Sequence, residues 1–513
     1  MLRHLVPFVA LLVGAIQVQP AAAQSGADLV KLAVEAQGGA DALRALKSLT
    51  IRGAAKHWEP GQSHVPGGEP RFIGDSTFVT TGDVATRSVR VEWDRDRKYP
   101  QVVRHKFTEI ITPRYGVLIN DKGEQSPMSG VLLASHHREL SRGSPFLMLR
   151  ALDNPQSIVA MPDQNVGDRS LPAVTIAVGN ARLIVMFDRA TKLPAVIRTR
   201  DDEIVYGDSN YDLTLSDWKS VGGAKLAHAL SFRLNDTEVQ RLTYNEVVAN
   251  PTIAADAFAV KDDVKAKAPA PAADPPYQMA IRRTFTGGAL NDGIYLPPGG
   301  SLRLVELAPN VQHVVGASHN NLIVAMKDGL VVFDAPYNDL QSRWVIDAAK
   351  QKYPGKPIKQ LVLMHHHIDH TGGTRAYVAE GAELVIPAQA RAFFEQMVAA
   401  KHTVTPDALA KSPKPAKIVD VKETLTLKDD TMTINLYNIP NPHADGMLIA
   451  HVAGPNILFI TDLISPRGPI ARTPATVAVG AALRKYNIND ALIAGAHGTT
   501  AKQAEIGPAL AAN

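Results

Sequence analysis

The residues with the clearest chemical potential form a histidine-rich stretch in the second half of the chain. This stretch runs His-His-His-Ile-Asp-His-Thr-Gly-Gly from His365 to Gly373 and follows the apolar run Leu361–Met364. Imidazole and carboxylate are the ligands that suit zinc where no thiolate is present, and the chain has no cysteine. Because four such ligands within six residues cannot share one face of a helix or strand, we expect a loop at a strand end that folds round a metal. The two glycines would let the backbone turn tightly into a helix.

Three more candidate ligands each lie at the end of an apolar, strand-like segment. They are His443 after Met432–Ile439, Asp462 after Ile457–Thr461, and His497 after Ala491–Ala494. Open α/β sheets place their sites where several strand ends converge on one edge. The sequence therefore predicts that these three residues meet the histidine-rich stretch there.

This set of motifs resembles the metallo-β-lactamase superfamily. The resemblance rests on H-x-H-x-D-H, a later His, a later Asp after an apolar strand, and a last His in a small-residue turn. It covers about Ala280 to Asn513 and implies an α/β fold, an αββα sandwich of two packed sheets flanked by helices. By position, it implies one zinc ion bound by His365, His367 and His443, a second bound by Asp369, His370 and His497, and Asp462 as the bridge between them. His366 falls at a variable position and is not an implied ligand.

Such a ligand set implies a hydrolase. Two zinc ions about 3.5–4 Å apart can hold a bridging water whose pKa falls to about 7. The resulting hydroxide would cleave an ester, a lactone or a phosphodiester. Asp369 is the predicted catalytic residue because it could orient this nucleophile while serving as a ligand.

Other activities of the superfamily fit to different degrees. The β-lactamases that share H-x-H-x-D-H lack the bridging carboxylate, so Asp462 counts against that activity. Alkylsulfatases carry additional C-terminal domains, whereas sixteen residues follow His497. Three alternatives stay open: a mononuclear iron dioxygenase, because persulfide dioxygenases keep the same ligands; a β-lactamase; and a lipid carrier with a structural metal domain. Iron therefore remains a candidate metal.

Residues 24–260 are expected to form a mostly antiparallel β domain. A helical pattern, Ala27–Leu49, is interrupted by Gly38–Gly39, and short segments rich in Val, Ile, Thr and Phe follow. The helical start and the closing stretch Tyr244–Pro251 resemble LolA-like periplasmic lipoprotein carriers, which implies a curved sheet with an apolar hollow. The adjacent His136–His137 is expected to be a solvated surface pair. The segments expected to be strands include Arg87–Trp93, Lys106–Thr112, Ala173–Val178, Leu183–Phe187, Ala195–Arg200, Leu230–Leu234 and Val239–Val248.

Residues 261–276 are rich in Ala and Pro, which predicts a stiff, extended linker. The domain beyond it, 277–513, opens with strand-like segments, and the apolar runs Asn321–Met326 and Leu330–Asp334 around an Asp-Gly turn predict a hairpin. A helix is expected near Asn338–Lys352. His319, Tyr337 and Arg467 lie in nearby loops and are not assigned to the site.

The N-terminus predicts export. Residues 1–23 contain a basic start, an apolar stretch from Leu5 to Ile16 and Ala21-Ala22-Ala23, the pattern of a cleaved signal peptide. We expect a periplasmic or secreted protein with no stable membrane span. The chain has 54 Lys+Arg against 50 Asp+Glu, and its basic residues do not gather in one block. This argues against nucleic acid as a partner and leaves a small-molecule substrate. The sequence predicts no oligomeric state.

Overall fold

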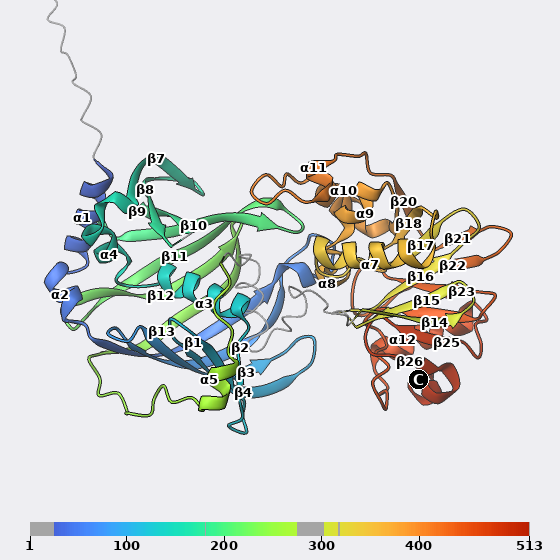
Figure 1. Ribbon diagram of the computed structural model, residues 1–513, viewed down its shortest axis with the longest axis horizontal. Helices are drawn as coiled ribbons and strands as arrows, with labels where there is room; N and C mark the ends of the chain where they lie inside the picture. The colour runs from blue at the N-terminus through green and yellow to red at the C-terminus, as the bar shows by residue number, and fades with distance from the viewer. Residues whose placement is uncertain (1–24, 180, 274–301, 317–318, 512–513) are drawn as a thin grey trace, which may run out of the picture.

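The computed structural model describes residues 25–179, 181–273, 302–316 and 319–511. A β domain formed by the first half of the chain lies beside an α/β domain formed by the second half (Figure 1). The predicted signal peptide, residues 1–23, and the end of the predicted linker, residues 274–276, lie outside these ranges. Across the described ranges, no helix has the length and apolar character needed to cross a membrane.

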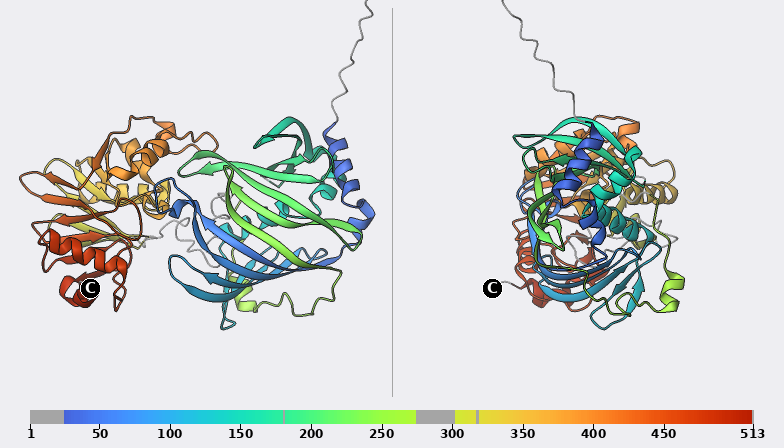
Figure 2. Two further views of the ribbon diagram at one scale, coloured as in Figure 1. Left: turned by 180° about the vertical axis from the view of Figure 1, so that it is seen from behind. Right: turned by 90° about the vertical axis from the view of Figure 1, so that its left-hand side faces the viewer.

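The β domain is built on one antiparallel sheet, in which thirteen strands are described. Strand β1 pairs with both β2 and β13, so the first and last strands of the sheet are neighbours at its centre. The sheet is strongly curved (Figure 2). Across the sheet, the strands are β6 (Gln125–Pro127), β5 (Gly116–Ile119), β4 (Val103–Ile111), β3 (Ser88–Arg97), β2 (Arg71–Asp83), β1 (Ser48–Glu59), β13 (Thr237–Ala249), β12 (Ala224–Leu234), β11 (Gly207–Val221), β10 (Pro194–Glu203), β9 (Ala181–Phe187), β8 (Arg169–Val178) and β7 (Ile158–Val166). The predicted antiparallel β domain is confirmed, and each segment expected to be a strand falls largely within one.

Short helices cover the apolar surfaces of this sheet. The expected helical start forms α1 (Gly26–Ala36) and α2 (Ala40–Ala45), which are separated at the two glycines, and the chain is already extended from Ser48. Helix α3 (Gly130–Arg142) packs Leu132 and Leu133 against strands β1 to β4. Helices α1, α2 and α4 (Leu147–Asp153) lie at the end of the domain away from the α/β domain (Figure 1).

The expectation of an extended linker is wrong over Asp262–Lys267, which form helix α5. Val264 on this helix is buried together with Ile110 and Val117 of the sheet. Acidic residues in the first turn and lysines in the last turn also suit the helix dipole. The burial of Val264 and these charges favour a helix in the first part of a segment whose composition predicts a connector.

The α/β domain is a sandwich of two sheets. Strands β17, β18, β19 and β20 run parallel, whereas β14 to β17 are antiparallel neighbours. In the described residues, one sheet holds β14 (Arg303–Ala308), β15 (Val311–Val315), β16 (Asn321–Ala325), β17 (Leu330–Phe333), β18 (Ile358–Val362), β19 (Glu383–Pro387) and β20 (Ile418–Val421). The other holds β21 (Thr424–Lys428), β22 (Thr433–Asn438), β23 (Leu448–Val452), β24 (Ile457–Ile460), β25 (Leu492–Gly495) and β26 (Thr500–Lys502). The predicted hairpin is confirmed, since β16 pairs with β17.

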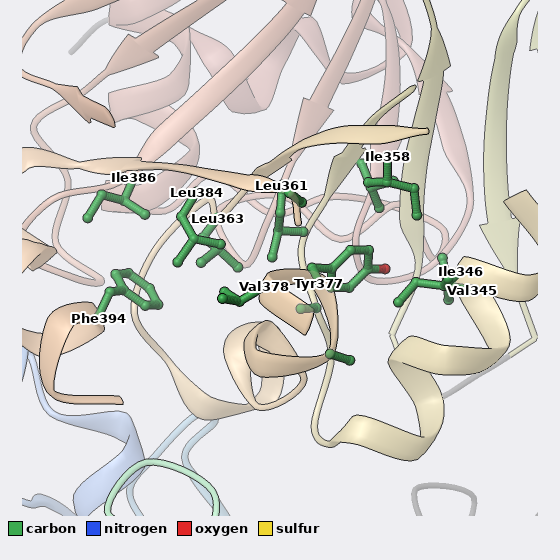
Figure 3. Close-up of a cluster of buried hydrophobic side chains, with 14 of the residues drawn as sticks. Val345, Ile346, Ile358, Leu361, Leu363, Tyr377, Val378, Leu384, Ile386 and Phe394 are labelled. Atoms are coloured by element: carbon green, nitrogen blue, oxygen red, sulfur yellow. The ribbon is translucent and has the colours of Figure 1, made fainter. Parts of the chain in front are cut away.

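Successive side chains of a strand point to opposite faces of its sheet, and this alternation divides the domain into layers. In β17, Val331 and Phe333 face the opposite sheet, whereas Leu330 and Val332 belong to the cluster beneath the outer helices. Figure 3 shows that outer cluster. Helices α7 (Asp339–Lys352), α9 (Thr374–Glu380) and α10 (Arg391–Ala399) cover the first sheet, and α12 (Pro474–Lys485) and α13 (Gly507–Leu510) cover the second. The predicted αββα order is confirmed, and α7 corresponds to the expected helix.

The two domains share buried surface. Ile204 and Val205, in the turn between β10 and β11, belong to the same buried cluster as Phe394 and Met397 of α10. Next to this turn, the backbone N–H of Asp208 donates to the carbonyl of Lys401 at 2.7 Å. These contacts fix the β domain against the helical side of the sandwich.

Replacing Phe459 by Ala should destabilise the sandwich. Phe459 is fully buried between the two sheets, where its ring centroid lies 5.8 Å from that of Phe333. We expect a loss of about 3–5 kcal/mol in the free energy of unfolding, because the cavity cannot collapse completely between two sheets. Urea unfolding of the full chain measures it, with Val305→Ala on the exposed side of β14 as the control. A loss below about 1 kcal/mol for Phe459→Ala would contradict this packing.

Candidate metal centre

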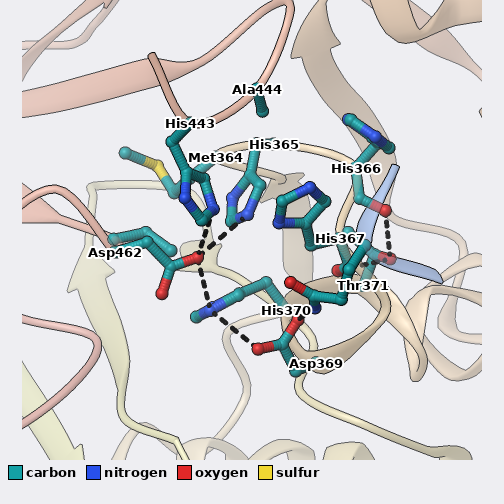
Figure 4. A network of polar contacts seen from close by, with 12 residues as sticks. Met364, His365, His366, His367, Asp369, His370, Thr371, His443, Ala444 and Asp462 are labelled. Carbon is teal, nitrogen blue, oxygen red and sulfur yellow. Dashed lines mark hydrogen bonds and ion pairs between the residues drawn. The ribbon is translucent and has the colours of Figure 1, made fainter. Parts of the chain in front are cut away.

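The candidate ligands lie at one edge of the sandwich, on loops and, for Asp369 and His370, on the short helix α8 (Ile368–Thr371). The histidine-rich stretch follows β18, and His443, Asp462 and His497 follow β22, β24 and β25. The strand ends are tied together, since the N–H of Leu448 donates to the carbonyl of Met364 and that of Ala496 to Ile460. The structure therefore brings all seven predicted ligands together, as predicted from the strand ends. Figure 4 shows six of them, without His497.

The ligand atoms fall into two groups, and those within each group lie within 4.8 Å of one another. The first group consists of His365, His367, His443 and Asp462. Oδ2 of Asp462 lies 3.0 Å from Nε2 of His365 and 3.0 Å from Nε2 of His443. Nδ1 of His367 is buried and has no hydrogen-bond partner in the described part of the chain.

The second group contains one histidine that the sequence did not assign. Its members are His319, Asp369, His370 and His497. Nε2 of His319 lies 3.4 Å from Oδ2 of Asp369, and its ring centroid is 4.2 Å from that of His497. A signal for it existed in the predicted hairpin, because antiparallel pairing of β16 with β17 puts the start of β16 at the edge where β17 ends.

Asp462 joins the two groups. Its Oδ1 lies 2.6 Å from Nε2 of His497, and its Oδ2 lies 3.3 Å from Nε2 of His370. Burial alone would raise the pKa of this carboxyl, but the charge of His370 and the hydrogen bonds from nearby histidines hold it well below its usual range. Asp462 also has a positive φ of 55°, a conformation that Asp adopts at some cost and that turns the side chain to the cluster.

A buried carboxylate beneath the cluster orients His370. Oδ2 of Asp334 accepts from Nδ1 of His370 at 3.1 Å and from the Thr461 hydroxyl at 2.9 Å, and Oδ1 accepts from the N–H of Met364 at 3.0 Å. Since Nδ1 carries the proton, Nε2 is the nitrogen left to face the cluster. Asp334 was seen in the sequence only as the end of a strand, so its role was missed.

The β domain also reaches the centre. The side chain of Gln62 donates to Asp369, and the carbonyl of Ser63 lies within hydrogen-bond distance of His366 and His367. His366 is thereby held away from both groups, in agreement with its exclusion as a ligand. Gln62 and Ser63 precede the histidine-rich stretch by more than 300 residues, and no sequence motif linked them to it.

One expectation about other residues is wrong. His136 is buried on α3, with Nε2 3.3 Å from Glu109, so His136–His137 is not a solvated pair. Gly372 and Gly373 form the predicted turn into α9, but both have negative φ, so the turn itself does not require glycine. They allow close packing instead, because a Cβ at Gly372 would lie 2.0 Å from the carbonyl oxygen of Tyr337.

The residues present fit bound metal ions. Both groups combine imidazole nitrogens with carboxylate oxygens, the donor set that zinc and iron accept without thiolate. Nδ1 of His367 is a buried acceptor without a partner among the described residues, which is costly in a metal-free site. The geometry could therefore hold a metal in each group, and the assignment of each ligand stays a prediction.

Comparison with known proteins agrees with this geometry. The family model of the metallo-beta-lactamase superfamily matches residues 315–499, which contain both groups. The C-terminal half is a metallo-β-lactamase domain. That match covers about a third of the chain and does not extend to the β domain.

Individual relatives match parts of the chain. An (R)-specific secondary-alkylsulfatase of a Pseudomonas species is 36% identical over 78 residues, which span 15% of this chain and 12% of the relative. A solved metallo-β-lactamase from Pontibacter korlensis is 16% identical over 41% of this chain and 97% of its own, with a TM-score of 0.33. A solved sec-alkylsulfatase from Pseudomonas is 19% identical over 43% of this chain and 42% of its own, with a TM-score of 0.32.

Replacing Asp334 by Asn should weaken metal binding by the metallo-β-lactamase domain. In either orientation the amide N–H would point at a buried donor, either the N–H of Met364 or the His370 ring beside the Thr461 hydroxyl. The variant therefore loses the carboxylate that satisfies all three donors and orients His370. We expect metal affinity to fall about 10–100-fold and the free energy of unfolding to fall by about 1–3 kcal/mol. Chelator competition and urea unfolding measure the two effects, with Asp347→Asn on the exposed face of α7 as the control. Unchanged metal affinity would show that His370 needs no such support.

Proposed function

We propose that the protein is a metal-dependent hydrolase that holds two ions, zinc by preference, in the two ligand groups. The observation that carries this proposal is the position of Asp462, whose two oxygens contact histidines of both groups. A shared carboxylate is suited to hold two ions close together. Bound there, the ions would supply an activated water and a positive charge for the substrate oxygen.

Substrate would approach from the side of Asp369, His443, Asp462 and His497. The side chains of these residues are 12–19% exposed, whereas those of His365 and His370 are fully buried. Asp369 is the catalytic residue in this proposal. Its carboxylate can accept a hydrogen bond from the attacking water and so orient it toward the substrate.

The proposed substrate is an ester, a lactone, a phosphodiester or a sulfate ester. Sequence reasoning set sulfate esters aside, because alkylsulfatases carry additional C-terminal domains. The 36% identity to a secondary-alkylsulfatase over 78 residues supports including them. The position of Asp462 continues to disfavour a β-lactam, because the β-lactamases with this motif lack that carboxylate.

We also propose that the protein acts outside the cytoplasm, in the periplasm or secreted. The support is the signal-like pattern of residues 1–23. A cysteine-free centre is compatible with an oxidising compartment, where exposed thiols would be at risk.

The experiment combines metal analysis with a substrate panel. Purified full-length protein should contain about two zinc ions per chain and should turn over at least one of an aryl ester, a lactone, a phosphodiester, a secondary alkyl sulfate and a chromogenic β-lactam. Removing the metal with a chelator should abolish the turnover, and added zinc should restore it. Asp369→Ala should lower the rate by at least about 100-fold, whereas Asp347→Ala should not.

Other outcomes would overturn the proposal. Protein without bound metal would contradict it, and so would an Asp369→Ala variant with the wild-type rate. One iron per chain with oxygen consumption would indicate a dioxygenase. The lipid-carrier alternative predicts binding of a fluorescent lipid without turnover, in the apolar cavity lined by Leu147, Met148, Trp218 and Leu226 of the β domain.

A further inference from the structure

A short segment of the β domain lies directly on the candidate metal centre. This bridging segment, Glu59–Arg71, leaves the end of β1, forms a 3-10 turn at Pro60–Gln62 and returns into β2. In Figure 4 the blue ribbon of the N-terminal half passes beside His366 and His367. Through Ser63 and Gln62 the segment contacts both ligand groups.

The carbonyl of Ser63 sets the proton position on His367. Its oxygen lies 2.9 Å from Nε2 of His367 and 2.8 Å from Nε2 of His366. A carbonyl can only accept, so both rings must carry a proton on Nε2. In the neutral ring of His367 this leaves the lone pair on Nδ1, the buried atom that has no hydrogen-bond partner in the described ranges.

The side chain of Gln62 fixes the orientation of Asp369, which belongs to the other ligand group. Its Nε2 donates to Oδ1 of Asp369 at 2.5 Å, and its Oε1 accepts from the hydroxyl of Tyr99 at 2.8 Å. The two contacts together fix the orientation of the amide. With Oδ1 of Asp369 occupied, Oδ2 is left toward His319 at 3.4 Å and His370 at 3.7 Å.

Arg71 holds the bridging segment in place. Its Nε donates to the carbonyl of Gln62 at 2.6 Å, and its Nη2 donates to the carbonyl of His443 at 3.0 Å. The guanidinium also lies 4.4 Å from the ring centroid of Tyr99. The ring of Tyr99 stacks on that of His443, with 6.3 Å between the two ring centroids. One cation therefore links the segment, the tyrosine and a ligand-bearing loop of the other domain.

We propose that the β domain is part of the metal centre, with Ser63 positioning His367 for one metal ion and Gln62 positioning Asp369 for the other. Histidines and carboxylates that bind a metal generally need outer hydrogen-bond partners that fix their orientation. Here two of these partners, Gln62 and Ser63, come from another domain. Gln62 is a positioning residue in this proposal, since it acts through Asp369. The inference rests on the proposed metal-dependent function.

The test measures each metal-binding step separately in the full-length protein. Apoprotein is titrated with Co²⁺, followed by visible absorption and by competition with a chelator. Gln62→Met keeps the length of the side chain but removes both hydrogen bonds. We expect it to weaken one of the two binding steps about 10–100-fold and to leave the other within about twofold of wild type, because Gln62 contacts a ligand of one group only.

Tyr99→Phe provides a second test, since it removes only the hydroxyl that holds the Gln62 amide. It should weaken the same step by less than Gln62→Met does, and it should add nothing in the Gln62→Met background. Glu69→Gln changes an exposed side chain of the same segment and serves as the matched control. It should bind Co²⁺ as the wild type does.

The outcomes separate this inference from the proposed function. If wild-type protein binds no Co²⁺, the proposed function itself fails, and this inference fails with it. If wild type binds two ions and Gln62→Met binds both as tightly, only the inference is overturned. Equal weakening of both steps, with a lower melting temperature, would also overturn it, because that result indicates a general role in folding.

Discussion

The largely buried carboxylate of Asp462 among imidazoles is the interaction on which the arrangement of the candidate metal centre depends. Taking a carboxylate out of water costs several kcal/mol unless partners surround it, and here those partners come from three separate connections, of which one carries both His365 and His370. Such loops meet only if the strands that carry them end at one edge. Two face-to-face sheets achieve this, and the outer helices then cover the apolar faces that the sheets leave. The αββα order therefore brings the candidate ligands to one edge of the sandwich.

The meeting of the candidate ligands could be predicted from the sequence because the information about their positions is local. His443, Asp462 and His497 each lie within a few residues of the end of an apolar segment, and the type and period of those segments predict strands. The convergence of strand ends then places the side chains without knowledge of the rest of the fold. The same reasoning, extended to the antiparallel pairing of β16 and β17, would have included His319.

The residues that support the ligands could not be predicted in this way. Gln62 and Ser63 reach the centre from a loop more than 300 positions away, and nothing in the local sequence distinguishes them from other loop residues. The helix in the linker and the buried His136 have the same cause, since each depends on a packing partner that only the folded chain supplies. Composition predicted an extended linker and an exposed histidine pair, whereas contacts with distant residues produced a helix and a buried side chain.

The separation between the bridging segment and the histidines has a consequence for biosynthesis. A chain is made from its N-terminus, so Gln62 and Ser63 emerge long before Asp369 and His367 exist. The sheet of the β domain, as far as its strands are described, can form before that point, because β13 ends at Ala249. The β domain can then act as a template for the second half of the chain, and the two groups of candidate ligands are incomplete until His497 has been added.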